Sequence, residues 1–451
     1  MSKQDQKELR QQIVCEWLQE NYLNYGSLRH DVVTDRLQIR MADSLEDASL
    51  QNAPEGLQFR GKENWRNLTD KDINTMVCQC VAEKGVNIST NEMWTALKSD
   101  MVPAVHPLRA WLDGLRPYTA DQPDWIDWLA QQVRVKPSGE EAKGDKARGD
   151  KARGEELWRT CFKKWFVAMV ASWMHDEVVN HTALVLVGRQ GIFKTTWLEH
   201  LIPPALRAYS SKMPLNGQIN KDDRLRLCEN AMLNIDELDA ICGREMNIVK
   251  SLLTSTDVNE RAAYGRLKER RMRLASFCAS TNNREFLTDI TGNRRWLPFE
   301  VESIQNPFHI TLPYERIYAQ AKALIEGGTY MYWFDLEDIE QLEKHNEDFR
   351  AQENEEQLLP ILFDIPAEGK GEFMTTAEIS DKLVTYGGIK KPMSIRQLGM
   401  LLAKRGFQKK QVYLSGSNVR GWIVYKRQTD EIELLKKMDS YSATSQPTDL
   451  Y

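Results

Sequence analysis

Residues 184–197 read LVLVGRQGIFKTTW, and residues 231–238 read AMLNIDEL. The first segment is an apolar strand, then a turn with two glycines, then Lys-Thr-Thr at the start of a helix. This order is that of a P-loop, whose backbone amides and lysine surround phosphate groups. The second segment is an apolar strand ending in two carboxylates, which such folds use to hold Mg²⁺ and to activate water. The two segments predict an α/β P-loop core with a parallel sheet.

The loop is the predicted binding site for ATP. The residues predicted to contact the nucleotide are Gly188, Gln190, Gly191, Ile192, Phe193, Lys194, Thr195 and Thr196. Gly188 and Gly191 allow the backbone to approach phosphates, Lys194 would reach the β- and γ-phosphates, and the Thr195 hydroxyl would bind Mg²⁺. Phe193 stands where the P-loop pattern has its second glycine, so that its Cβ would strain or shift the turn. The alternative is an ordinary strand–turn–helix with a surface lysine.

The polar residues after the next two strands are the predicted catalytic groups. Asp236 would hold Mg²⁺, and Glu237 would orient or deprotonate the attacking water. The alternative for Asp236 is a helix N-cap. The strand 274–281, LASFCAST, ends at Asn282 and Asn283. We assign contact with the γ-phosphate to Asn282, with Asn283 in reserve.

The loop TGNRRW carries two adjacent arginines, Arg294 and Arg295. Guanidinium groups stabilise the charge that develops on a transferred phosphoryl group, and a neighbouring subunit often supplies them. We therefore predict a catalytic role for both residues. The alternative is a surface ion pair for each.

A basic segment, residues 257–273, lies between the acidic pair and the third strand. Its cationic residues, which flank Tyr264 and Gly265, are Arg261, Arg266, Lys268, Arg270, Arg271 and Arg273. Basic side chains with one aromatic ring suit a nucleic-acid backbone and a stacked base. We predict that this segment contacts single-stranded DNA, and the alternative is a solvated helix face.

Composition along the chain predicts six regions. These are a mostly helical region (1–136), a flexible charged linker (137–154), the ATPase domain (155–349), a second linker (350–370), a winged-helix domain (371–427) and an acidic flexible tail (428–451). The first linker repeats Gly-Asp-Lys-Ala-Arg and has no apolar residue larger than alanine, so it cannot bury a core. The helix that begins at Glu155 is apolar nearly all round and is expected to be buried.

The region 371–427 carries eleven Lys/Arg against three Asp/Glu. Thr375 and Ser394 are expected to cap two helices, and two alternating strands, Gln408–Leu414 and Val419–Tyr425, follow them. Two helices and a hairpin make a winged helix–turn–helix, with Leu398, Leu401 and Leu402 in its core. Its cationic residues are Arg396, Lys404, Arg405, Lys409, Lys410, Arg420 and Lys426. We expect this domain to bind duplex DNA, and the alternative is a protein contact.

The whole-chain composition sets further limits. The 451 residues carry a formal net charge of −5 and seven cysteines without zinc-finger spacing. Scattered thiols favour a reducing, cytoplasmic location. No apolar run reaches about 18 residues, so no membrane span is expected, and the polar start does not read as a signal peptide.

Five motifs in order resemble the virulence-associated protein E family. They are LVLVGRQGIFKTTW, NIDEL, the basic YGR segment, ASTNN and LTDITGNRRWLPFEV, and the similarity covers about residues 102–301. The resemblance implies an AAA+ or superfamily 3 helicase-like ATPase of phages and plasmids, with nucleotide roles for the residues assigned above. Family members often occur beside or fused to a primase. This chain has no primase carboxylate cluster, so priming would come from a separate protein.

The leading hypothesis is a DNA-dependent ATPase that acts as a ring helicase, hexamer-like, in the replication of a phage or mobile element. One alternative is a regulatory switch ATPase that binds DNA or protein without translocating. The other is a non-catalytic DNA- or origin-binding protein, for which Phe193 is the best support.

Overall fold

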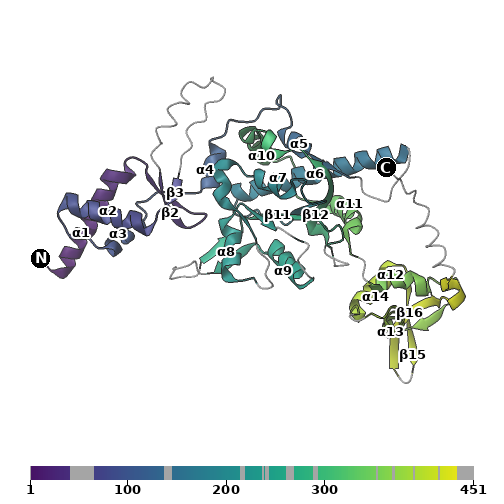
Figure 1. Cartoon of the computed structure of the whole chain (residues 1–451). Coiled ribbons are helices and arrows are strands. Elements are labelled where there is room, and N and C mark those ends of the chain that lie inside the picture. Colours follow the sequence, from purple (N-terminus) through teal and green to yellow (C-terminus); the bar gives the residue numbers. More distant parts are fainter. Residues whose placement is uncertain are drawn as a thin grey trace. The chain divides into compact units, whose positions relative to one another are not determined.

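The computed structural model describes residues 2–40, 65–136, 145–213, 219–235, 238, 243–260, 269–287, 293–351, 354–367, 371–389, 392–414 and 417–433. The chain divides into two compact units (Figure 1). Unit 1 consists of Met1–Asn283 and Arg295–Leu342, and unit 2 consists of Arg284–Arg294 and Glu343–Tyr451.

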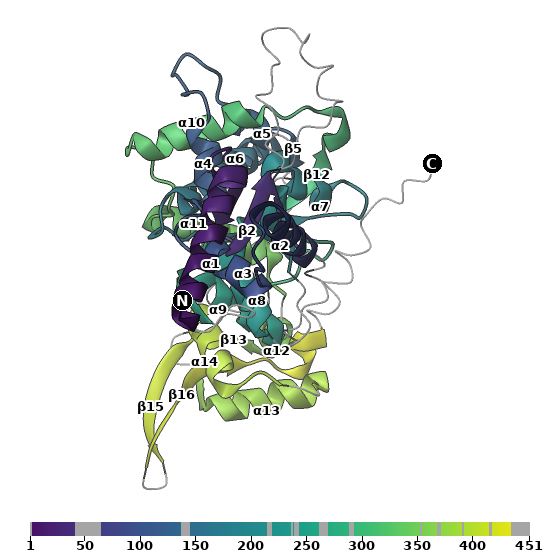
Figure 2. The ribbon, with the colours of Figure 1, turned by 90° about the vertical axis from the view of Figure 1, so that its left-hand side faces the viewer.

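The first part of unit 1 combines three helices with a small sheet. Its elements are α1 (Lys3–Leu18), a π-helical turn (Gln19–Leu23), β1 (Leu28–Asp31), β2 (Arg36–Arg40), β3 (Trp65–Asn67), α2 (Asp70–Lys84), α3 (Thr90–Leu97) and β4 (Ala104–Val105). The strand order is β3-β2-β1-β4, and α1, α2 and α3 lie toward the viewer in Figure 2. The expectation of a mostly helical region missed this sheet. Its strands are short, and only β2, RLQIR, alternates polar and apolar residues, over five positions; β1, LRHD, and β3, WRN, do not.

A six-stranded sheet forms the centre of unit 1. Its strands are β5 (Val133–Val135), β6 (Ala183–Val187), β7 (Ser210–Lys212), β8 (Met232–Ile235), β11 (Ser276–Thr281) and β12 (Trp296–Ile304), in the order β5-β12-β6-β11-β8-β7. All neighbours are parallel except β5, which pairs antiparallel with β12. The predicted α/β architecture with a largely parallel sheet is confirmed. β6, which precedes the glycine turn, lies between β12 and β11.

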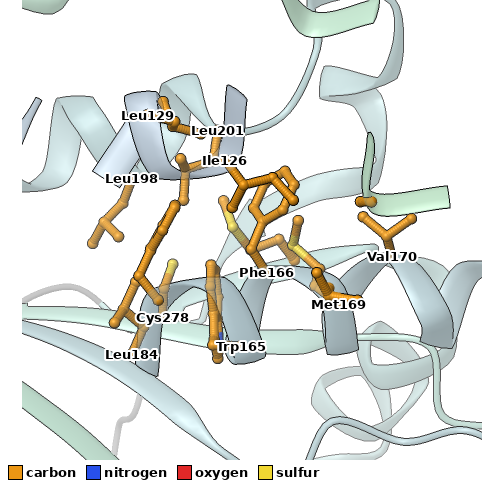
Figure 3. Close-up of a cluster of buried hydrophobic side chains, with 14 of the residues drawn as sticks. Ile126, Leu129, Trp165, Phe166, Met169, Val170, Leu184, Leu198, Leu201 and Cys278 are labelled. Atoms are coloured by element: carbon orange, nitrogen blue, oxygen red, sulfur yellow. The ribbon is translucent and has the colours of Figure 1, made fainter. Parts of the chain in front are cut away.

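Helices cover the central sheet. They are α4 (Pro107–Asp113), α5 (Trp125–Ala130), α6 (Asp145–Met174), α7 (Lys194–His200), α8 (Lys221–Glu229), α9 (Gly243–Thr254), α10 (Tyr314–Glu326) and α11 (Leu336–Asn346), the last of which continues into unit 2. The predicted buried helix is α6, and its inward residues lie among side chains of β6, β11, α5 and α7 (Figure 3). Burying one such Leu or Phe side chain contributes about 1.5–3 kcal/mol.

The start of α6 differs from the prediction. We expected residues 137–154 to be a flexible linker, but the helix begins at Asp145. The prediction for 145–154 was wrong because these residues include good helix formers, namely Ala, Lys and Arg, and continue a helix whose later turns are buried. Residues 137–144 lie outside the described residues.

Unit 2 contains a compact set of short elements. They are α12 (Asn354–Leu362), β13 (Phe363–Asp364), β14 (Glu372–Met374), α13 (Thr376–Gly387), α14 (Ile395–Lys404), β15 (Gln408–Leu414) and β16 (Ser417–Lys426). Thr375 and Ser394 cap α13 and α14 as predicted, each with a capping box. Leu398, Leu401 and Leu402 are fully buried. β15 and β16 form a hairpin that extends from the helices of this unit (Figure 2).

The predicted second linker, 350–370, is largely ordered. α12 and β13 lie within it, and Leu359 and Leu362 enter the core of unit 2. Its acidic residues are buried with partners: Glu356 accepts from Arg350, and Glu355 accepts from the Met393 amide at 2.6 Å. Among the described residues, no helix is long and apolar enough to cross a bilayer.

Candidate nucleotide-binding site

Two glycines shape the turn after β6. Gly188 has φ +152° and Gly191 has φ +85°. A Cβ built on Gly188 would lie 3.0 Å from the Val301 carbonyl oxygen and 3.1 Å from Ile192 Cδ1. The Gly188 amide donates to the Thr281 carbonyl at 3.1 Å, which ties the loop to the end of β11. A side chain at Gly188 would make tight contacts and would need a φ that residues with a Cβ rarely adopt, so glycine suits this position.

Phe193 adopts the left-handed conformation that the P-loop pattern reserves for glycine. Its φ is +67° and ψ is +18°, and it is the N-cap of α7 without a side-chain capping bond. Such a conformation costs a residue with a Cβ about 1–2 kcal/mol. The Phe193 carbonyl accepts from the Trp197 amide at 2.8 Å, so α7 starts normally. α7 therefore has its first backbone hydrogen bond, and Phe193 accommodates the turn by adopting a strained left-handed backbone conformation.

Lys194 turns back onto the loop. Its Nζ donates to the Gly188 carbonyl at 2.7 Å, the Arg189 carbonyl at 2.8 Å and Asn282 Oδ1 at 3.0 Å. The residue is only 7% exposed. Charge-assisted hydrogen bonds of this kind hold an ammonium group in a defined position. The loop lysine and the predicted amide at the end of β11 are thus brought together.

Thr195 is anchored to the same strand. Its Oγ1 lies 2.9 Å from the Oγ of Ser280, a buried residue of β11. Sequence reasoning had not selected Ser280, although a serine inside the apolar strand that precedes Asn282 was a usable signal. Thr196 accepts a hydrogen bond from His200 Nδ1 through its backbone carbonyl, at 2.7 Å. The backbone amide of Asn283, the reserve candidate, donates to Thr281 Oγ1 at 3.1 Å.

The predicted acidic pair follows β8. This strand ends at Ile235, and its residue pairing with β11 places that end at the same carboxyl edge as Val187 and Thr281. Asp236 and Glu237 lie outside the described residues, so their roles stay predictions. Within the part of the chain that the structure describes, no group of three or more His, Cys, Asp or Glu side chains could hold a metal ion.

The two arginines of the TGNRRW loop lie in a short 3₁₀ turn, Asn293–Arg295. Arg294 is exposed and Arg295 is half-buried. The chain passes from unit 2 to unit 1 between them. Their catalytic role stays a prediction.

The basic segment 257–273 forms the two arms of a β-hairpin. β9 (Asp257–Glu260) and β10 (Glu269–Met272) pair antiparallel. The tip, with Arg261, Tyr264, Gly265, Arg266 and Lys268, lies outside the described residues. In the arms, Arg270 is ion-paired with Asp257, and Arg271 contacts Glu229 at 3.4 Å. In the described residues 257–260 and 269–272, paired strands replace the solvated helix face that was the alternative.

Arg273 cannot contact DNA, which corrects the prediction for this residue. It is 1% exposed. Its guanidinium donates to five backbone carbonyls, those of Asn180, Leu252, Leu253, Ser255 and Ala275. Burial lowers the pKa of Arg273 to about 9. The residue ties the base of the hairpin to the end of α9 and to the segment before β6.

Most cationic side chains predicted for unit 2 are on its surface. Arg396, Lys410, Arg420 and Lys426 are exposed. Others are engaged: Lys404 pairs with Glu347 at 2.6 Å, Arg405 with Glu356 at 3.5 Å, and Lys409 lies over the Trp422 ring at 5.2 Å. The exposed cations are distributed over α14 and the β15–β16 hairpin.

The mostly parallel sheet, with a glycine turn and a buried lysine after a central strand, defines an α/β protein with a P-loop-like core. Residues 151–351 match the family model described as the Virulence-associated protein E-like domain. The match includes the strands β6, β8, β11 and β12. It agrees with the resemblance found in the motifs.

Comparisons of the whole chain are weaker. No curated protein matches it. A solved structure, the apo structure of the NrS-1 C terminal region (305–718), has a TM-score of 0.43 and 12% identity, over 89% of this chain and 97% of that chain. An A form apo structure of the same region has a TM-score of 0.41 and 12% identity, over 88% and 96%. TM-scores below 0.5 do not establish a shared fold.

Proposed function

We propose that this chain is a DNA-dependent ATPase that works as a ring helicase in the replication of a phage or other mobile element. One observation carries the proposal. The Nζ of Lys194 and the Oδ1 of Asn282, 88 residues apart in the chain, lie 3.0 Å apart at the carboxyl edge of the sheet. Ligands of open α/β sheets bind at that edge.

The loop residues fit a triphosphate. Gly188 and Gly191 adopt positive φ values, and turns of this kind present backbone N–H groups to anions. Lys194 would exchange its bonds to the loop carbonyls for bonds to phosphate oxygens. The Thr195 hydroxyl and Asp236 would hold Mg²⁺, whose charge would offset that of the phosphates.

The remaining site residues would act on the attacking water and on the γ-phosphate. Glu237 would take the proton of the water. Asn282 would orient that water and the γ-phosphate while its Oδ1 holds Lys194. Arg294 or Arg295 would reach the nucleotide of a neighbouring subunit in a hexamer-like ring.

DNA would meet two surfaces. The hairpin tip, 261–268, has three cationic residues and one tyrosine and would follow a single strand. We propose that unit 2, with the element order α12, β13, β14, α13, α14, β15, β16, is a winged helix. Its α14 would enter a duplex groove and its hairpin would contact the backbone. Priming would come from a separate protein.

The alternatives stay open at the level of activity. A switch ATPase would hydrolyse ATP without regard to DNA, and a binding protein would not hydrolyse it. Phe193 favoured the binding protein. That support is weaker because the turn around Phe193 keeps the Gly188 and Trp197 backbone bonds.

ATP hydrolysis by the full chain, with and without single-stranded DNA, tests the proposal. We expect turnover that DNA stimulates and that Lys194→Ala abolishes. Lys71→Ala changes an exposed lysine of α2 and is the matched control, expected to be unaffected. Turnover indifferent to DNA would point to the switch, and none in the unmodified chain would point to the binding protein.

A further inference from the structure

An exposed aromatic ring lies beside the phosphate loop. Phe308 is in a short turn, Pro307–His309, that follows β12, and it is 70% exposed. Its ring is edge-on to Phe193, with centroids 6.4 Å apart and planes at 80°. It is also edge-on to His200, at 5.6 Å and 88°. Phe308 thus keeps contact with both ends of α7 while much of its surface remains open to water.

Phe193 connects this ring to the loop. It carries backbone strain that glycine would avoid, and its side chain packs partly against the central core. Strained residues persist where their surroundings over-determine them, and they cluster at ligand sites. The side chain of Phe193 supports Phe308, which offers a reason for a phenylalanine at this position.

The position of Phe308 relative to the sheet limits which ligand it could meet. β12 is the neighbour of β6 on the side opposite to β11. Asn282 therefore follows the strand on one side of the loop, and Phe308 follows the strand on the other side. A nucleotide whose phosphates occupy the loop carries its base only one sugar away. An exposed ring at the loop is suited to stack on that base, since every base has a π-face.

We propose that Phe308, braced edge-on by Phe193, is the stacking platform for the purine base of the bound nucleotide. The inference rests on the proposed function, because it requires a nucleoside triphosphate in the loop. Stacking recognises the area of a ring system and not its edge. This platform therefore favours purines over pyrimidines and treats adenine and guanine alike.

Calorimetric binding of ATP, GTP, CTP and inorganic tripolyphosphate to the full chain tests the platform. Base–aromatic stacking corresponds to about a tenfold change in affinity or more. We expect Phe308→Ala to weaken ATP and GTP binding by about tenfold and CTP binding by less, with tripolyphosphate binding unchanged. Phe308→Trp retains a large π-face and should retain affinity. Trp333→Ala removes another exposed aromatic residue of unit 1 (56% exposed) and is the matched control.

The outcomes distinguish a failure of the stacking proposal from a failure of the proposed function. If Lys194→Ala abolishes binding of both ATP and tripolyphosphate while Phe308→Ala binds ATP normally, the platform is wrong and the nucleotide site stands. If Phe308→Ala weakens tripolyphosphate as much as ATP, the residue supports the loop and does not stack on a base, which also overturns the inference. If the unmodified chain binds neither ligand, the proposed function fails as well.

Discussion

The ammonium of Lys194 and the side-chain oxygen of Asn282 are hydrogen-bonded at 3.0 Å, although one residue follows β6 and the other follows β11. The two strands are adjacent and parallel, with Val187 opposite Thr281. Because parallel strands end at a common edge, a lysine and an amide that follow them meet there. This pair links the loop to the strand that carries Ser280, the partner of Thr195.

The first prediction separates the two asparagines after β11. Asn282→Ala removes the side-chain bond to Lys194, whereas Asn283 uses its backbone amide in the bond to Thr281. We expect Asn282→Ala to lower kcat for ATP hydrolysis by about 10- to 100-fold. Loss or misplacement of one polar group that contacts the reacting phosphate has an effect of this size. Asn283→Ala should change it less than about threefold. Steady-state hydrolysis measures both, and equal losses would refute the assignment.

The second prediction concerns the buried arginine. Arg273→Met leaves five backbone carbonyls, in three segments of the chain, without their donor, and each such group is costly to bury unpaired. We expect the free energy of unfolding to fall by about 2–4 kcal/mol. Arg270→Ala, at an exposed ion pair, should cost less than about 1 kcal/mol. Urea unfolding followed by tryptophan fluorescence compares them. Similar losses in the two variants would contradict the burial of Arg273.

The third prediction is a pH dependence from His106. Burial, with the nearby Arg109 guanidinium, lowers the pKa of His106 from 6.5 to about 4. Below pH 6.5 the unfolded chain therefore binds a proton that the folded chain rejects. The stability that this group contributes above pH 6.5 is lost as the pH falls toward 4. Partial exposure limits the effect to about 1–2 kcal/mol.

His106→Asn provides the comparison for that pH effect. His106 Nδ1 accepts from the Arg109 amide at 3.3 Å as the N-cap of α4, and asparagine is also a good N-cap. The variant should keep the helix start and lose this share of the pH dependence. Unfolding free energies of the two proteins between pH 4 and 7 measure it, and parallel curves would refute the assignment.

The fourth prediction concerns the exposed cations of unit 2. If α14 and the hairpin contact duplex phosphates, Arg396→Ala and Lys410→Ala should each weaken binding to a short labelled duplex. Each should also lower the slope of log affinity against log salt by about 1, because one counterion fewer is released. Lys344→Ala, at an exposed lysine of α11, should leave the slope unchanged. Unaltered slopes in both test variants would favour a protein contact.

Local signals accounted for most of the correct expectations. Thr375 and Ser394 were recognisable as helix caps because a capping hydroxyl bonds an amide three residues away. The glycine turn before Lys194 was also recognisable from local sequence, because glycine adopts a positive φ at a single position without steric cost. Local signals failed where composition concealed burial. The start of α12 was predicted to be a linker, yet its Glu356 is buried and paired with Arg350.

By itself, the sequence determined an α/β P-loop-like core and the candidate residues Lys194, Thr195 and Asn282, because strand, turn and helix signals act over a few residues. Only the tertiary structure decided which groups meet. It joined Lys194 to Asn282 and Thr195 to Ser280, and it set Phe308 against Phe193. It also buried Arg273 against the Asn180 carbonyl, 93 residues earlier in the chain. Such contacts depend on how distant segments pack, and no local pattern encodes the burial of a charge.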